Sequence, residues 1–172
     1  GVQTCALPIL LSHDEVQQLL DKLAARQPKL VEELTPGKLP LGTITRTLQN
    51  LLTESVSLRD MRSIAEALTD ASARTQDPEQ LASQIRPRIG RMIVQSLVDP
   101  QETLLAMTLD PSLEQMLHNV SQHGAQGQGL LLEPGLAERL FKALREGART
   151  VEDQGHPAVL VVSPGIRPWL SK

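Results

Sequence analysis

Aromatic residues are nearly absent from this sequence. Among its 172 residues, Phe141 and Trp169 are the only aromatic ones, and there is no tyrosine. Lysine and arginine number 17 against 20 aspartates and glutamates, and charges of both signs are interspersed. Nucleic-acid binding favours clustered positive charge and stacking aromatics. The composition therefore argues against a nucleic-acid partner and predicts a core of aliphatic side chains.

Long apolar runs and cysteines are also scarce. No run of 18 apolar residues occurs, so no membrane-spanning helix is predicted, although the chain can still belong to a membrane protein. The single cysteine, Cys5, lies within residues 1–9, which read as the translation of a sequencing adapter. We predict that residues 1–9 are such an artefact, the alternative being a short natural extension. The rest of the chain then has no thiol chemistry.

The first quarter of the chain has the periodicity of amphipathic helices. Ser12 and Glu15 have the spacing of a capping box, which predicts a helix over about 13–26. A short helix is predicted from Pro28 to a Thr-Pro-Gly turn, and a third helix over about 41–53.

Two further helix starts follow. Ser57 is predicted to begin a helix, with Val56 and Met61 packing across its first turn. A second start, Asp77-Pro78, opens a long helix running toward Val98. Because Pro87 removes a backbone hydrogen bond inside that helix, a kink or break is expected near Arg86.

The second half mixes strands and helices. Residues 102–109 are predicted to form a strand, Asp110 to cap the next helix, and 121–129 to form a loop. A second strand at 130–132 would complete an arrangement that resembles a winged helix, followed by a helix from Pro134.

A last strand is predicted at residues 158–162, where an uninterrupted apolar run is typical of a buried parallel strand. A helix follows from Ser163-Pro164. Because no neighbouring strand is evident for this run, the chain is expected to be cut within a domain. The fold class is predicted as mostly α with small β elements, in several subdomains: a winged-helix-like helical middle, then the start of an α/β subdomain.

Candidate catalytic and ligand-binding patterns are weak. The segment nearest to a phosphate-binding loop is Pro36-Gly37-Lys38, which lacks the first glycine and the hydroxyl residue of that motif. The four histidines show no metal-binding spacing, and Ser163 is better explained as a helix cap than as a nucleophile. We predict no catalytic residues, no cofactor and no metal site.

Several collinear motifs resemble the FlhA family, the export-gate proteins of flagellar and virulence type III secretion. They are Pro28 to Leu34, Thr47 to Leu52, Val56 to Ile64, Thr75 to Glu79, Gly90-Arg91, Leu132 to Ala137 and Val161 to Leu170. The strings Arg59 to Arg62 and Arg74 to Pro78 resemble the flagellar branch more than the virulence branch. The resemblance spans residues 11–172.

The resemblance implies a fragment of a cytoplasmic C-terminal region made of four subdomains. The expected pieces are the end of the second subdomain (10–35), the last piece of the first (36–55), the helical third (56–135) and the start of the fourth (136–172). It implies a non-enzymatic docking platform for export substrates and their chaperones. The implied partners are those chaperones with their cargo, other export-apparatus components and copies of the chain in a ring. The implied location is the cytoplasmic face of the bacterial inner membrane, with the membrane-embedded half outside this chain.

By position, the family's chaperone-docking groove implies five contact residues: Leu11, Leu34, Leu39, Gly42 and Thr43. Gly42 stands where flagellar members more often carry threonine. Taken from the sequence alone, Leu34 and Leu39 flank a turn, where apolar side chains can belong to a core or to an exposed patch.

Two other function classes deserve comparison. A winged-helix DNA-binding regulator would contact DNA through residues 57–98 and could use Arg86, Arg88 and Arg91. It needs a basic recognition helix, whereas residues 57–70 carry three acidic residues against two arginines. An α/β hydrolase built on Ser163 lacks its partner residues.

Overall fold

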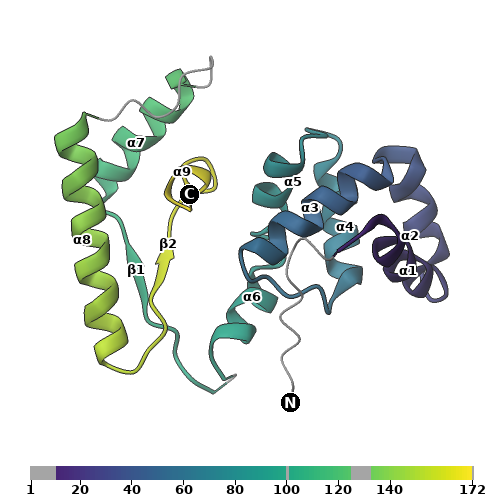
Figure 1. Ribbon diagram of the computed structural model, residues 1–172, viewed down its shortest axis with the longest axis horizontal. Helices are drawn as coiled ribbons and strands as arrows, with labels where there is room; N and C mark the ends of the chain where they lie inside the picture. The colour runs from purple at the N-terminus through teal and green to yellow at the C-terminus, as the bar shows by residue number, and fades with distance from the viewer. Residues whose placement is uncertain (1–10, 100, 125–132, 172) are drawn as a thin grey trace. The chain divides into compact units, whose positions relative to one another are not determined.

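The computed structural model describes residues 11–99, 101–124 and 133–171. The chain divides into two compact units, one ending at Ser96 and the other beginning at Leu97. Figure 1 shows both units in one colour gradient from the first residue to the last. Each unit is described by itself.

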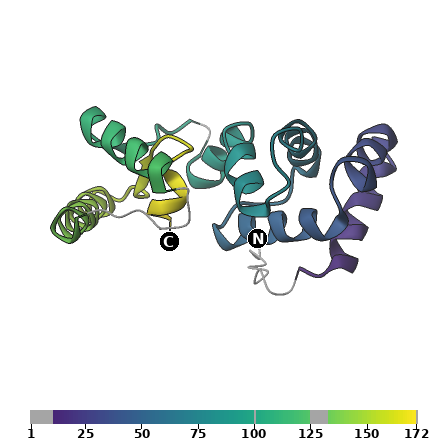
Figure 2. The ribbon, with the colours of Figure 1, turned by 90° about the horizontal axis from the view of Figure 1, so that it is seen from above.

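The first unit is built from helices. Their bounds are α1 (His13–Ala24), α2 (Pro28–Glu32), the π-helical turn η2 (Glu33–Lys38), α3 (Leu41–Thr53), α4 (Met61–Ala71), α5 (Pro78–Ile85) and α6 (Gly90–Leu97). Helix α3 packs against both α1 and α5, and α4 packs against α5. In Figure 2, α3 lies along one side of this unit with α1 at one of its ends.

The core of the first unit is aliphatic, as the composition predicts. Its largest fully buried side chains are Leu20, Leu34, Leu39, Ile44, Leu48, Leu51, Ile64, Leu68, Leu81, Ile85 and Ile89. They come from helices α1, α3, α4 and α5. Leu34 lies in η2, Leu39 directly after it, and Ile89 directly before α6. One continuous apolar cluster therefore holds this unit together.

The helix starts are set by side-chain caps, and one differs from the prediction. The capping box of Ser12 and Glu15 and the Asp77 cap of α5 are confirmed. Ser57 does not begin a helix: α4 begins at Met61, and the Asp60 carboxylate accepts hydrogen bonds from the backbone N–H and the hydroxyl of Ser63. A carboxylate is a stronger acceptor than a hydroxyl, so Asp60 fixes the start of the helix.

The predicted break near Arg86 is confirmed. Helix α5 ends at Ile85, α6 begins at Gly90, and Pro87 lies between them. Arg86 donates to the carboxylate of Glu54 at 2.6 Å, and both side chains are largely buried. This ion pair ties the break to the C-terminal end of α3.

The second unit contains a two-stranded sheet and three helices within its described residues. They are β1 (Ala106–Thr108), α7 (Pro111–Gly124), α8 (Pro134–Asp153), β2 (Val159–Val161) and α9 (Arg167–Leu170). The strands are parallel, with Met107 opposite Leu160. The parallel strand predicted at 158–162 thus has its neighbour within the chain, so the expectation that none is present is wrong.

Three other predictions for this unit change in extent. The strand predicted over 102–109 forms only at residues 106–108, and α7 continues through the first part of the loop predicted at 121–129. The strand predicted at 130–132 lies outside the described residues. Strand β2 is half-buried instead of buried, and Val161 is 52% exposed, because a two-stranded sheet leaves much of its surface uncovered.

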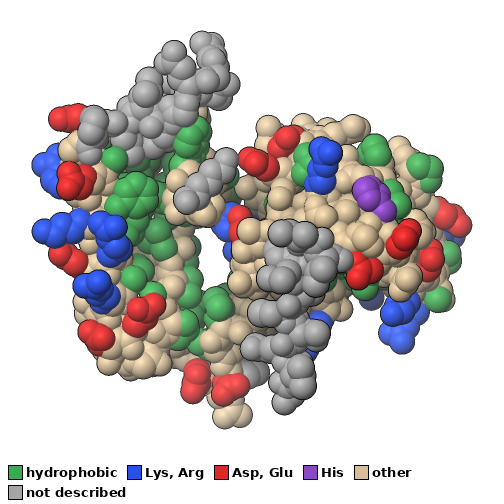
Figure 3. All heavy atoms as spheres, viewed as in Figure 1, with side chains coloured by type: hydrophobic (Ala, Val, Ile, Leu, Met, Phe, Trp, Pro, Cys, Tyr) green, Lys and Arg blue, Asp and Glu red, His purple; other side chains and the backbone are tan. Residues whose placement is uncertain are grey.

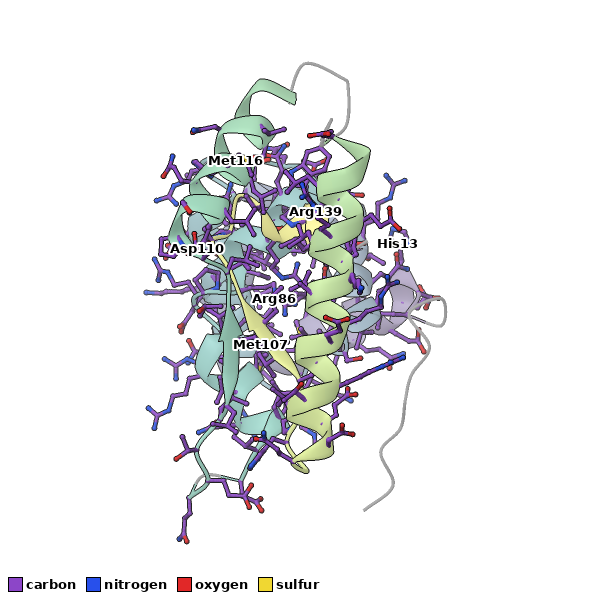
Figure 4. All side chains as sticks on the ribbon, turned by 90° about the vertical axis from the view of Figure 1, so that its left-hand side faces the viewer. His13, Arg86, Met107, Asp110, Met116 and Arg139 are labelled. Atoms are coloured by element: carbon purple, nitrogen blue, oxygen red, sulfur yellow. The ribbon has the colours of Figure 1, made fainter. Side chains whose placement is uncertain are left out.

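Helix α8 shares a small apolar cluster with other elements of the unit and approaches strand β1 closely. Leu140 on α8 joins Leu109, Leu117 and Ile166 in a small buried cluster. A Cβ added to Gly147 would lie 3.0 Å from the sulfur of Met107 on β1, so glycine allows the close approach of helix and strand. Figure 4 shows Met107 on β1 beside α8.

The predicted fold class is confirmed: the described residues are mostly helical, with one small sheet. The border between the compact units at Ser96 falls inside the predicted helical subdomain 56–135. The subdomain borders implied by the family resemblance remain a prediction.

Candidate docking surface

The segment from Leu34 to Thr43 links the first two helices to α3 by an irregular path. It leaves the helical conformation at Thr35, where φ is −139° and ψ is 134°, inside the π-helical turn. Leu39 and Pro40 are extended, and α3 begins at Leu41. Proline at the N-cap position and the Pro-Gly pair in the turn explain why helix α2 does not continue into α3.

Leu34 and Leu39 anchor this segment from beneath. Both side chains are 0% exposed and belong to the main core cluster, and the Leu39 N–H donates to the Leu34 carbonyl at 2.8 Å. Of the two readings left open by the sequence, the core reading is therefore correct. In this conformation the two leucines support the surface and do not line it.

Lys38 fastens the turn to the rest of the unit. Its ammonium group lies 2.6 Å from the Glu33 carboxylate and donates to the Thr69 carbonyl near the end of α4 at 3.5 Å. The Lys38 carbonyl accepts a hydrogen bond from the side-chain amide of Gln76 at 3.4 Å. The turn is thus tied to α4 and to the loop before α5, which fixes its position before any partner arrives.

The accessible part of the segment consists of prolines and small residues together with the half-buried Lys38 and Leu41. Pro36, Gly37 and Pro40 are exposed, and Gly42 and Thr43 are half-buried. The Thr43 N–H donates to the Pro40 carbonyl at 3.0 Å, so the first turn of α3 is closed. We define the docking surface as the exposed and half-buried residues of the segment 36–43.

Leu11 lies at the edge of this unit with 9% of its side chain exposed. Its carbonyl accepts a hydrogen bond from the side-chain amide of Gln49 on α3 at 2.8 Å. This bond holds the start of α1 against α3. The structure therefore brings Leu11, Gly42 and the docking surface into one neighbourhood.

His13 is a neighbour of this surface that sequence reasoning missed. A Cβ added to Gly42 would lie 3.4 Å from Nε2 of His13, so the imidazole ring lies over the Gly42 backbone. From the sequence, the four histidines could be judged only for metal spacing, and His13 shows none. The residues are 29 positions apart, so only packing of α1 on α3 reveals their contact.

Two of the three arginines that a DNA contact could use are paired with carboxylates. Arg86 pairs with Glu54 and Arg88 lies 2.7 Å from the Asp70 carboxylate, whereas Arg91 is exposed; Arg62 pairs with Glu66. A DNA contact needs unpaired positive charge on one face. The winged-helix regulator is therefore disfavoured.

The perturbed carboxyl groups of this chain cap helices. The Ser63 hydroxyl, followed by its backbone N–H, lowers the pKa of Asp60 below its usual value. The Ser112 hydroxyl, with the backbone N–H groups of Ser112 and Leu113, lowers the pKa of Asp110 in the same way. Figure 4 shows Asp110 at the start of α7. Hydrogen bonds to the ionised form explain both shifts, so neither group is marked as catalytic.

Within the described ranges, no group of three or more His, Cys, Asp and Glu side chains is placed to hold a metal ion. None of the helices in those ranges is long and apolar enough to cross a membrane.

Comparisons with known proteins give one consistent family. The model of the FHIPEP family matches residues 3–172. The flagellar biosynthesis protein FlhA of Salmonella typhimurium is 40% identical over 163 residues, which are 95% of this chain and 23% of that protein. The chain thus spans about a quarter of the length of this curated relative. The family match includes most of residues 1–9, and their assignment to an adapter remains a prediction.

Solved structures share the fold. The chain resembles a protein from the Chlamydia pneumoniae CdsV and CdsO complex with a TM-score of 0.77 at 24% identity, covering 96% of this chain and 48% of that one. It resembles nonameric EPEC SctV-C with a TM-score of 0.76 at 24% identity, covering 95% and 48%. At this identity the likeness concerns the fold.

Proposed function

Because the chain belongs to the FHIPEP family, we propose that it is part of the cytoplasmic docking platform of a flagellar type III protein export gate. In this proposal it receives export substrates bound to their chaperones, and it catalyses no reaction. The observation that carries the proposal is the 40% identity to a flagellar biosynthesis protein over nearly the whole chain.

The architecture of the segment 34–43 supports this role. Leu34 and Leu39 are buried anchors, and Lys38 ties the turn to α4, so the docking surface is held in place before binding. A preorganised surface binds more tightly than a flexible one because less conformational entropy is lost on association. Small residues also allow a partner's side chains to approach the backbone closely.

The proposed partners extend beyond chaperones. One solved structure with this fold is described as nonameric and another as a complex with a second protein, CdsO. By analogy, we expect copies of the full-length protein to assemble into a ring and to contact other export components. The location proposed for this region is the cytoplasmic face of the bacterial inner membrane, with membrane attachment outside this chain.

The proposal can be tested by placing a charge on the docking surface without disturbing the core. Thr43 is half-buried in the first turn of α3, where a carboxylate interacts favourably with the helix dipole. Thr43→Glu should therefore fold normally while adding bulk and charge to the surface. A purified flagellar chaperone and cargo complex would be titrated against the full-length protein, and we expect about tenfold weaker binding for the variant.

The matched control is Gln18→Glu, which adds the same charge to an exposed position on α1. It should bind as the wild type does. Equal binding by Thr43→Glu and the wild type, with both folded, would show that docking does not use this surface. Leu39→Asp is unsuitable for this test because it places a carboxylate in the core.

A further inference from the structure

The edge of the docking surface carries two polar side chains from different helices. His13 comes from the first turn of α1 and Arg46 from α3, and both are exposed. Figure 4 labels His13 on the ribbon of α1, and Figure 3 shows hydrophobic, basic and acidic side chains interspersed on the visible face of this unit.

Both residues are neighbours of Gly42 on α3. Nε2 of His13 lies 3.4 Å from the point that a Cβ on Gly42 would occupy. Arg46 is four residues after Gly42 and therefore shares its face of α3. Side chains in a helix lean toward its N-terminus, which for Arg46 is the direction of Gly42. His13 and Arg46 are thus both neighbours of Gly42, His13 across the contact of α1 with α3 and Arg46 one turn along α3.

The hydrogen bond from Gln49 to the Leu11 carbonyl keeps this arrangement in place. Gln49 is seven residues after Gly42, on the same face of α3, and its 2.8 Å bond fixes the chain just before His13. The capping box of Ser12 and Glu15 fixes the first turn of α1. The backbone beside His13 is therefore held against α3, the helix that carries Arg46.

The pair has donors available for a partner. Neither His13 nor Arg46 forms an ion pair with a carboxylate of the described residues, whereas Lys38 on the same segment is paired with Glu33. A guanidinium has several N–H donors arranged to meet a carboxylate, and an imidazole adds another. An acidic side chain is the group that complements both.

We propose that His13 and Arg46 are specificity-determining residues that receive a carboxylate of the docked chaperone and cargo complex, an inference that rests on the proposed function. Docking then combines apolar and small-residue contacts on 36–43 with one charged contact at their edge. The apolar part depends little on salt, whereas the contact at Arg46 weakens as salt rises, because ions screen exposed charges.

The test compares the double variant His13→Ala/Arg46→Gln with the wild type in full-length protein. A purified flagellar chaperone and cargo complex is titrated at low and at high salt, and folding is checked by circular dichroism. We expect the double variant to bind about threefold to tenfold more weakly at low salt. At about 1 M salt the two proteins should bind alike, since the Debye length falls to about 3 Å.

Arg26→Gln is the matched control because it removes one positive charge from an exposed position just past the other end of α1, about 20 Å away. It should bind as the wild type does at every salt concentration. If the wild type binds and the double variant binds equally well, or if Arg26→Gln weakens binding as much, the assignment of His13 and Arg46 is wrong. If the wild type does not bind at all, the proposed function fails, and this inference fails with it.

Discussion

Replacing Leu68 by alanine should strongly destabilise the first unit. The side chain of Leu68 lies on α4 and is 0% exposed. Leucine to alanine removes three carbons, worth about 0.8 kcal/mol each in lost burial, or about 2.4 kcal/mol. A residual cavity of roughly 40 Å³ adds about 1 kcal/mol, which gives a total of about 3.4 kcal/mol. For a unit of this size each kcal/mol lowers Tm by about 4–8 °C, so a fall of at least about 13 °C is expected.

The measurement is thermal unfolding of the 172-residue chain, followed by far-ultraviolet circular dichroism. The control is Val94→Ala on α6, where the valine is 40% exposed and the expected loss is below about 1 kcal/mol. If Leu68→Ala melts within a few degrees of the wild type, α4 is not part of a packed core. The same argument explains why Leu68→Asp should prevent this unit from folding, since its carboxylate would have no partner in the core.

Two further substitutions test local features. Asp60→Ala should lower the free energy of unfolding by about 1 kcal/mol at neutral pH, because α4 loses its cap. The folded-state pKa of Asp60 lies below its usual value of 3.8, so the stabilisation by this cap is present above pH 3.8 and is lost as the pH falls through the folded-state pKa. Denaturant unfolding at several pH values should therefore show the free energies of unfolding of the wild type and Asp60→Ala converging in acid. Gly155→Ala should lower the free energy of unfolding by about 1 kcal/mol, because Gly155, which follows α8, has a φ of 81° that alanine rarely adopts. A Cβ at this position would meet no atom within 4 Å, so a fall in the unfolding midpoint would arise from backbone conformation alone. An unchanged midpoint would place the residue outside the ordered part of the second unit.

The helices could be predicted because their signals are local. The capping box at Ser12, the Asp77 cap and the proline at position 87 each act on the turn that contains them, and the structure confirms all three. The start predicted at Ser57 is wrong, because Asp60, three residues later, also offers an acceptor and its carboxylate accepts more strongly than a hydroxyl. The partner of β2 could not be identified, since a parallel strand pairs across a long crossover and β1 has little periodicity of its own.

By itself, the sequence determined the aliphatic helical character of this protein and its family. Apolar periodicity, helix caps and collinear motifs are properties of residues that are close in sequence, so they can be recognised without a structure. The tertiary structure alone decided which apolar residues near the turn face inward. Leu34 and Leu39 are buried because their segment packs against α4 and joins the main core cluster, while Gly42 meets His13 because α1 packs on α3. Those contacts join residues far apart in the chain, and local patterns carry no information about such distances.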